Sequence, residues 1–392
     1  MVDKDNNSGK GEEMMQYRTF GKLDWKVSAL GFGCMRLPTE TDANGNAGID
    51  EGEAIRMVRH AIDNGVNYLD TAYRYHGGQS EYLVGKALKD GYRDKVRLAT
   101  KAPMPLIKTA ADYDRILDEQ LKKLDLDYID YYLFHGLSKA NWDLVVEQEI
   151  LPHAEAAIKA GKIGHIGFSF HDSYKAFEEI VTGYDKWTLC QVQYNLMDEE
   201  NQAGTKGIEL AASKGIAVVV MEPLRGGKLG NPVKEVTEVM EKHGYKETLA
   251  NLALQWVWNH PEVSVVLSGM STMEQVQENL ASASRSSVGA MSKNDLALVK
   301  EIEAVYRQRA GIPCTSCGYC MPCPQGVDIP RMFSLYNESV AYNYFVESHR
   351  IYGMFGGTAG KCVQCKECEG KCPQTIPISE WMEKIKGIFE PA

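Results

Sequence analysis

The 392-residue sequence contains no long apolar run, and no window approaches the roughly 20 apolar residues that a membrane-spanning helix needs. It has no run of Lys and Arg either, and 53 acidic against 43 basic residues give a formal net charge of −10. Such a chain is a poor candidate for contacts with nucleic-acid phosphates. Residues 1–15 are polar and lack the apolar region of a signal peptide, so we expect a disordered tail. These absences predict a soluble, cytoplasmic protein that binds neither membranes nor nucleic acid.

The ten cysteines are unevenly placed along the chain. Cys34 and Cys190 stand alone in apolar segments, and the other eight form two tight runs, at 314–323 and 362–372. In a reducing cytoplasm such runs indicate metal sites more than disulfides. Zinc is the other alternative, but zinc ribbons use cysteine pairs separated by a longer loop that closes one tetrahedron. Two compact runs of four thiols favour iron–sulfur clusters.

The second run has the C-x2-C-x2-C-x3-C-P spacing of bacterial ferredoxins, and the first run is one residue shorter before its last cysteine. Residues 312–386 therefore resemble a ferredoxin module. In that pattern the fourth cysteine of each run ligates the other cluster. The resemblance implies two [4Fe–4S] clusters, the first held by Cys314, Cys317, Cys320 and Cys372 and the second by Cys362, Cys365, Cys368 and Cys323. The repeat of CPQGVDIPRMF in CPQTIPISEWM favours a mainly α-helical module over residues 310–392.

Residues 16–309 alternate short apolar or β-branched runs with amphipathic helical patterns. Eight runs are candidate strands, at 27–34, 68–72, 96–101, 128–135, 165–170, 189–195, 216–224 and 263–269. Eight alternations in about 300 residues predict an α/β fold of the (β/α)8 TIM-barrel type. A doubly wound sheet is the alternative. It would want a G-x-G-x-x-G motif after the first strand, where this chain has GFGCMR.

In such barrels the chemistry lies at the C-terminal ends of the strands. The predicted ends carry polar residues on every strand after the first, namely Asp70, Lys101, His135, Ser169, Gln191 with Asn195, Glu222 and Ser268. An ion pair between Asp70 and Lys101 could be purely structural, as could a buried His135. Three ionisable groups of different types on consecutive strand ends favour an active site instead.

Three motifs on successive strand ends carry a resemblance to a known family. They are LDTAYRYHGGQSEYLVGKAL at 69–88, ATK at 99–101 and LFH at 133–135. Residues from about 17 to 283 resemble the aldo-keto reductases, and the whole chain resembles the subgroup fused to a C-terminal ferredoxin domain. The resemblance implies a catalytic tetrad. Tyr75 would protonate the substrate carbonyl, Lys101 held by Asp70 would ease that transfer, and His135 would orient the carbonyl.

The resemblance also implies a site for a nicotinamide cofactor. Ser169 and Gln191 would hold the carboxamide, and Met221 stands where many members stack an aromatic ring on the nicotinamide. Leu224, Arg225, Gly226 and Gly227 would line the pyrophosphate. The adenosine site would comprise Ser268, Gly269, Gln275, Glu278 and Asn279. Ser271 occupies the position where many members have a base for the 2′-phosphate, so a preference for NADPH does not follow and the cofactor is NADPH or NADH.

These features predict an NAD(P)H-dependent reductase of an aldehyde, ketone or quinone, a small-molecule carbonyl substrate. A second hypothesis is an electron-transfer protein whose barrel docks a redox partner protein, and a third makes the clusters structural only. Hydride transfer moves two electrons, a cluster moves one, and the sequence shows no flavin-binding motif. Either an additional cofactor or partner couples the two, or the clusters take no part in hydride transfer.

Overall fold

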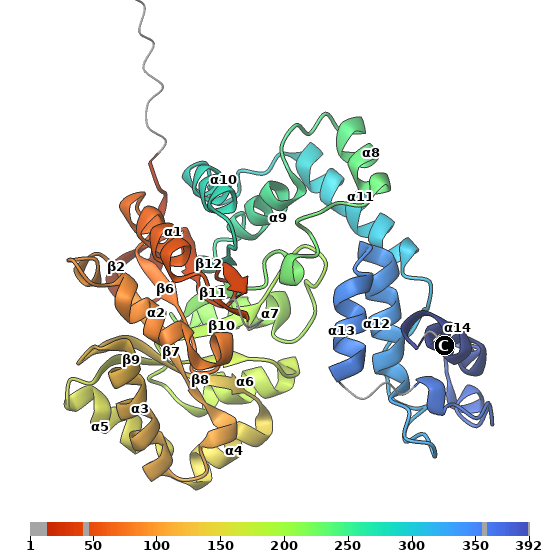
Figure 1. Ribbon diagram of the computed structural model, residues 1–392, viewed down its shortest axis with the longest axis horizontal. Helices are drawn as coiled ribbons and strands as arrows, with labels where there is room; N and C mark the ends of the chain where they lie inside the picture. Colours follow the sequence, from red (N-terminus) through yellow and green to blue (C-terminus); the bar gives the residue numbers. More distant parts are fainter. Residues whose placement is uncertain (1–13, 42–46, 355–358, 391–392) are drawn as a thin grey trace, which may run out of the picture. The chain divides into compact units, whose positions relative to one another are not determined.

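The computed structural model describes residues 14–41, 47–354 and 359–390 (Figure 1). The chain divides into two compact units, one of residues 1–226 with 251–291 and one of residues 227–250 with 292–392. Most of the predicted disordered tail lies outside the described residues. Met15 is buried, so packing begins just before the predicted boundary at residue 16. No helix in the described ranges combines the length and the apolar character needed to cross a membrane.

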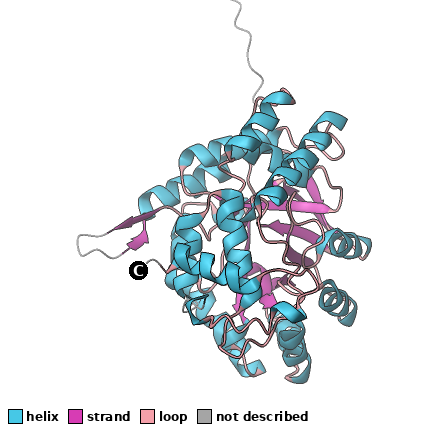
Figure 2. Ribbon diagram, turned by 90° about the vertical axis from the view of Figure 1, so that its right-hand side faces the viewer, coloured by secondary structure: helices cyan, strands magenta, loops and turns pink. Residues whose placement is uncertain are grey.

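A closed barrel of eight parallel strands forms the centre of the first unit, which confirms the predicted (β/α)8 architecture (Figures 1 and 2). Strands follow one another around the barrel in chain order, with β12 pairing back to β3. The strands are β3 (Leu30–Gly33), β6 (Tyr68–Asp70), β7 (Arg97–Pro103), β8 (Ile129–Leu137), β9 (Ile163–Phe170), β10 (Leu189–Gln193), β11 (Ala217–Met221) and β12 (Val263–Gly269). All eight predicted strands are therefore present; β3, β6, β10 and β11 are shorter than predicted, β7, β8 and β9 are longer, and β12 has the predicted bounds.

Amphipathic helices cover the outside of this barrel. Several begin at a side-chain cap: Thr109 and Asp112 form a capping box at α3, and Thr272 caps α10. Their apolar faces pack on the strands, which places the polar strand ends together at one mouth. The helices of this unit are α1 (Glu51–Asp63), α2 (Ser80–Ala87), α3 (Ala110–Leu124), α4 (Lys139–Glu147), α5 (Ile150–Lys159), α6 (Tyr174–Gly183), α7 (Gly204–Ser213), α9 (Leu249–Trp258) and α10 (Met273–Ser284).

A hairpin precedes the barrel and was not predicted. Strands β1 (Tyr17–Phe20) and β2 (Leu23–Ser28) pair antiparallel, so the predicted strand 27–34 is in fact the end of β2 followed by β3. Phe20 and Val27 are buried against inward side chains of the barrel strands, including Tyr68. The hairpin thus fills one end of the barrel with apolar side chains. A second short ladder, β4 (Thr39–Thr41) with β5 (Ala47–Ile49), projects at the left of Figure 2.

The second unit contains two helices that the sequence assigned to the barrel domain. Helix α8 (Lys234–Lys242) packs against α11 (Lys293–Arg309), burying Val236 and Met240. Lys242 Nζ lies 2.7 Å from Glu301 Oε1, and Arg309 pairs with Glu235. The predicted boundary at 309/310 coincides with the end of α11, but by packing both helices belong with the C-terminal residues.

The rest of the second unit is mainly helical, as predicted. It contains α12 (Ile329–Tyr342), α13 (Phe345–Met354) and α14 (Ile378–Phe389), of which α12 packs against both of the others. The two copies of the sequence repeat lead into α12 and α14, where Asp328 caps α12 and Pro377 precedes α14. Six of the eight clustered cysteines pack on the small core that these helices enclose.

Candidate active site and cluster-binding cysteines

Parallel pairing aligns three of the predicted catalytic residues at the barrel mouth. Asp70 is the last residue of β6, Lys101 lies in β7, and His135 lies in β8. In register, Asp70 pairs with Ala99, and Pro103 pairs with His135. Tyr75 comes from the 3-10 turn (Tyr75–Gly78) that follows β6. The strands and one short turn therefore bring the four side chains to the same region.

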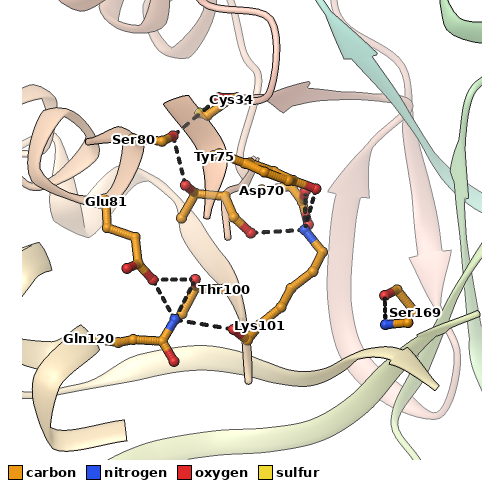
Figure 3. A network of polar contacts seen from close by, with 11 residues as sticks. Cys34, Asp70, Tyr75, Ser80, Glu81, Thr100, Lys101, Gln120 and Ser169 are labelled. Carbon is orange, nitrogen blue, oxygen red and sulfur yellow. Dashed lines mark hydrogen bonds and ion pairs between the residues drawn. The ribbon is translucent and has the colours of Figure 1, made fainter. Parts of the chain in front are cut away.

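Lys101 is the centre of this group (Figure 3). Its Nζ donates to Asp70 Oδ1 at 2.6 Å, to the Thr71 carbonyl at 2.8 Å and to the Tyr75 hydroxyl at 3.3 Å. The side chains of Lys101 and Asp70 are only 1% and 3% exposed. The ammonium group thus has three oxygen partners, one for each of its protons.

The electrostatics of the group suit an acid at Tyr75. Burial acts to lower the pKa of Lys101, but Asp70 and Tyr75 outweigh it, so its pKa is raised and it stays cationic. Burial raises the pKa of Tyr75, and Lys101 opposes that rise. The result is a phenol that is protonated at neutral pH, beside a cation that stabilises the phenolate once the proton has left.

His135 is a neutral imidazole at this site. Burial, and then the positive charge of Lys101, lower the pKa of His135 to about 3. Its ring lies edge-on to the Tyr75 ring, with the centroids 6.0 Å apart. A neutral imidazole can donate one hydrogen bond to a bound oxygen without competing with Tyr75 as the acid.

Two other ring side chains of this loop, Tyr73 and His76, have structural roles. The Tyr73 hydroxyl donates to Glu119 at 2.7 Å, and the Lys123 ammonium lies 3.5 Å from the centre of its ring. His76 Nε2 accepts from the backbone N–H of Leu37 at 3.2 Å, which ties the loops after β3 and β6 together. Tyr73 therefore ties this loop to α3, and His76 holds loop backbone.

Two of the predicted cofactor residues lie on neighbouring strands. Ser169 on β9 accepts from the Gly136 N–H at 2.8 Å, which leaves its own hydroxyl proton free to donate (Figure 3). On β10, the buried Oε1 of Gln191 has no hydrogen-bond partner among the described residues. A buried amide oxygen without a donor is costly. A carboxamide fits this pair of side chains, because its oxygen can accept from the Ser169 hydroxyl and its NH2 group can donate to Gln191 Oε1.

The predicted pyrophosphate residues follow β11. Met221 ends the strand, and Leu224 is half-buried beyond it. Arg225 Nη1 lies 3.5 Å from Asp198 Oδ1, and Gly226 has φ +66°, a backbone conformation that favours glycine. Asn195, another predicted strand-end residue, donates to the Glu222 carbonyl at 3.2 Å and so joins the loops after β10 and β11.

The predicted adenosine residues lie at the end of β12 and on α10. Asn279 Nδ2 donates to Ser268 Oγ at 3.0 Å, and the Ser271 N–H donates to Gln275 Oε1 at 2.8 Å. The Ser271 hydroxyl donates to the Arg36 carbonyl at 2.8 Å. Glu278 is exposed on α10, and a side chain at Gly269 would collide with the stem of Arg36.

Four of the eight clustered cysteines surround one cavity in the second unit. They are Cys314, Cys317, Cys320 and Cys372, and the apolar side chains of Phe333, Ile376 and Ile378 line the same cavity. Burial raises the pKa of Cys320, and its three neighbouring thiols raise it further. No three His, Cys, Asp or Glu side chains of the described residues form a site for a single metal ion. The donor set around this cavity fits the first predicted cluster, including its fourth ligand from the other run.

The other four cysteines are less completely brought together. Burial raises the pKa of Cys368 to about 11, with Glu369, Cys362 and Cys365 adding to the rise, so these three thiols are neighbours. Cys323 packs on the core of the unit, and its assignment to this group rests on the spacing alone. None of the ten cysteines forms a disulfide, and all ten lie within the described residues.

Three residues near the mouth were not singled out from the sequence. Glu81 lies inside the quoted motif at 69–88, and it is completely buried. Gln120 on α3 is also completely buried and bonds to Glu81, a contact that no sequence spacing indicates. Arg36, three residues after β3, is exposed; its aliphatic stem lies beside Gly269 and its Nη2 lies beside Gly226, one of the predicted pyrophosphate residues.

Comparison with known families agrees with this geometry. A family model described as the aldo/keto reductase family matches residues 29–303, and one described as a 4Fe-4S dicluster domain matches residues 313–376. The first match covers the eight strands of the barrel, and the second covers all eight clustered cysteines.

Individual relatives cover the barrel part of the chain. L-galactose dehydrogenase of Arabidopsis thaliana is 28% identical over 74% of this chain and 94% of its own length. The NADH-specific methylglyoxal reductase of Escherichia coli is 26% identical over 73% of this chain and 98% of its own length. The solved structure of aldo-keto reductase AKR11C1 from Bacillus halodurans, in its holo form, superposes with a TM-score of 0.59. It is 27% identical and covers 73% of this chain and 96% of its own.

Proposed function

Because this chain belongs to the aldo/keto reductase family, we propose that it reduces the carbonyl group of a small aldehyde, ketone or quinone, using NADH or NADPH. The observation that supports this most is the buried group of Asp70, Lys101 and Tyr75 beside a neutral His135. The bound dinucleotide would supply the hydride that adds to the carbonyl carbon. What the chain itself supplies is the proton and the site that holds both reactants.

In this proposal Tyr75 donates its phenolic proton to the carbonyl oxygen. Lys101, held 2.6 Å from Asp70, lies 3.3 Å from that hydroxyl and stabilises the phenolate that remains. His135 donates a hydrogen bond that orients the carbonyl. Because its pKa is about 3, His135 keeps this neutral form across the physiological range.

Ser169 and Gln191 would hold the carboxamide of the nicotinamide, and the segment from 224 to 227 would line the pyrophosphate. The choice between the two dinucleotides depends on the neighbourhood of Ser271. No base stands at position 271, and the Ser271 hydroxyl donates to the backbone carbonyl of Arg36. NADPH would find no charge-assisted contact at position 271, so the proposal includes NADH, the cofactor that appears in the name of one relative.

The second unit would hold two [4Fe–4S] clusters through the crossed cysteine sets. The cavity bounded by Cys314, Cys317, Cys320 and Cys372 supports the first set. The eight cysteines must stay reduced until the clusters assemble, so we propose that the protein resides in the reducing cytoplasm. Since hydride carries two electrons and each cluster carries one, a redox partner or further cofactor would be needed to join them.

Replacing Tyr75 by Phe tests the carbonyl-reduction proposal. We expect kcat for carbonyl reduction to fall by about 100- to 10,000-fold, because the general acid is lost while the packing is kept. Fluorescence titration should give unchanged dissociation constants for NADH and NADPH. Turnover equal to that of the natural enzyme would show that Tyr75 is not the acid.

A further inference from the structure

A second buried carboxylate lies behind the tetrad and takes no part in the proposed chemistry. Glu81, the second residue of α2, has a side chain with 0% exposure. A carboxylate in such a place is stable only if its oxygens find donors. The residues that bond to Glu81, and the groups that those residues position, indicate its role.

The partners of Glu81 are the residues around Lys101 (Figure 3). Glu81 Oε1 accepts from the Thr100 hydroxyl at 2.7 Å and from Gln120 Nε2 at 2.5 Å. Gln120 Nε2 also donates to the main-chain carbonyl of Lys101 at 3.2 Å, and Gln120 Oε1 accepts from the Tyr132 hydroxyl at 2.7 Å. Glu81 therefore holds the backbone of β7 at the catalytic lysine through two bonds.

The residue before Glu81 reaches the other side of the same lysine. The hydroxyls of Ser80 and Thr71 lie 2.8 Å apart, and Ser80 also donates to the Cys34 carbonyl at 3.1 Å. The Thr71 carbonyl accepts from Lys101 Nζ at 2.8 Å. The first turn of α2 thus holds both ends of Lys101, its main chain through Glu81 and an acceptor of its ammonium through Ser80.

We propose that Glu81, acting through Thr100 and Gln120, is a positioning residue that sets the distance between the Lys101 ammonium and the Tyr75 hydroxyl. It does not touch the substrate or the cofactor. The proposal rests on the proposed function in naming Tyr75 as the acid. It extends that function, because it makes the first turn of α2 and the inner face of α3 part of the catalytic apparatus.

The charges around both groups fix the sign of the expected effect. Tyr75 faces Lys101 on β7, Asp70 on β6, Cys34 after β3 and the neutral His135 on β8. Lys101 lowers the pKa of Tyr75, so a looser Lys101 lets it rise. Glu81 itself faces Lys123 and Glu119 on α3, and it is not among the main groups that act on Tyr75.

The experiment compares Glu81→Ala with Glu81→Gln, which retains an acceptor oxygen. For Glu81→Ala we expect a fall in kcat of about tenfold to a hundredfold with unchanged cofactor dissociation constants. The alkaline limb of its kcat profile should move to higher pH. Glu81→Gln should restore most of both properties. Gln120→Met removes the bonds to Glu81 and the Lys101 carbonyl, together with those to Thr100 and Tyr132, and should move the same limb in the same direction.

Leu83→Ala is the matched control, because Leu83 is buried on the same helix and bonds to none of these groups. Suppose that Leu83→Ala and Glu81→Ala lower the free energy of unfolding by similar amounts, and that both keep the kcat and the pH profile of the natural protein. Glu81 is then a structural residue, and the proposal is wrong. If Glu81→Ala does not fold, the Gln120→Met profile decides: a limb at the natural pH would overturn the proposal.

An NMR measurement of the Tyr75 pKa, which needs no substrate turnover, tests the positioning role of Glu81 separately from the proposed carbonyl reduction. In protein labelled with 13C at the tyrosine ring, the signal lost in Tyr75→Phe identifies Tyr75, and its pH titration reports the pKa directly. A higher pKa in Gln120→Met supports the positioning role even if no carbonyl substrate is turned over. An unmoved pKa overturns the positioning role even if the natural enzyme reduces carbonyls efficiently.

Discussion

The two sites of this protein are organised in different ways. At the barrel mouth, strands and side-chain contacts fix Asp70 and Lys101 before any ligand binds. In the cysteine runs, much of the backbone is irregular, residues such as Ser316 and Gln364 have positive φ, and the thiols of Cys317 and Cys365 are exposed. The first site is complete in the polypeptide alone. The second brings one set of four thiols around a cavity, leaves the other set less completely assembled, and would depend on iron to join them.

Removing iron from the second site should have the largest effect. Chelation under oxidising conditions should abolish amide-exchange protection in residues 313–328 and 359–377, while β7 stays protected, because only the cysteine loops depend on the metal. Cys320→Ser should lose about four of about eight irons per chain, measured by iron and sulfide analysis.

Cys190→Ala is the control for that loss, since Cys190 is buried on strand β10 and belongs to neither run in the sequence. Its iron content should equal that of the natural protein. If the barrel strands lose protection together with the cysteine loops, the two regions are not independent and the contrast between them is wrong.

Breaking the ion pair in the barrel should have the next largest effect. Asp70→Asn leaves the buried Lys101 ammonium without a countercharge, so we expect the free energy of unfolding to fall by about 3 kcal/mol. Denaturation followed by tryptophan fluorescence measures the loss, and iron content should be unchanged.

Asp130→Asn is the matched control in the same barrel. Asp130 pairs with Arg93 at 2.7 Å in a more exposed place, and we expect a loss of about 1 kcal/mol. Equal losses for the two variants would mean that burial does not distinguish these pairs.

Acid should weaken the barrel through His135, and this is the smallest effect we expect. The pKa of His135 is about 3 in the folded protein against about 6.5 when unfolded, so its contribution is complete above pH 6.5 and is lost as the pH falls toward 3. Between pH 7 and pH 5 the loss is about 2 kcal/mol.

His135→Asn should remove the part of the pH dependence of the free energy of unfolding that His135 causes, and should leave the parts that other groups cause. Denaturant titrations of both proteins at pH 7 and pH 5 measure the difference. A variant that loses as much stability as the natural protein over this range would show that His135 is not a buried neutral imidazole.

The barrel followed from the sequence because its signals are local. Each strand is a short β-branched run, and the rule that function lies at strand ends identified Asp70, Lys101 and His135 without a structure. The first strand was placed too early, because the β1–β2 hairpin has the same apolar character. The turn at Gly21, with φ +55°, and the alternation of apolar and polar residues from Leu23 to Val27 were the signals that mark the hairpin as a separate element.

What could not be predicted depends on contacts between distant segments. The bond between Glu81 and Gln120 joins residues 39 positions apart, and it requires knowing which face of α3 turns toward β7. The pairing of Cys372 with the first cysteine run was predicted only because the spacing of ferredoxins is distinctive. Nothing in the sequence indicated that α8 packs with α11, because its apolar pattern suits a barrel helix equally well.

The grouping of α8 with the C-terminal residues bears on how the chain is made. On the ribosome α8 emerges about 50 residues before α11, so the face carrying Val236 and Met240 must wait for its partner while α9, β12 and α10 are synthesised. Arg309, which pairs with Glu235, also donates to the carbonyls of Val340 and Ala341 on α12. A nascent chain halted at the end of the barrel sequence would therefore expose a helix whose partner does not yet exist, and quality control could recognise it there.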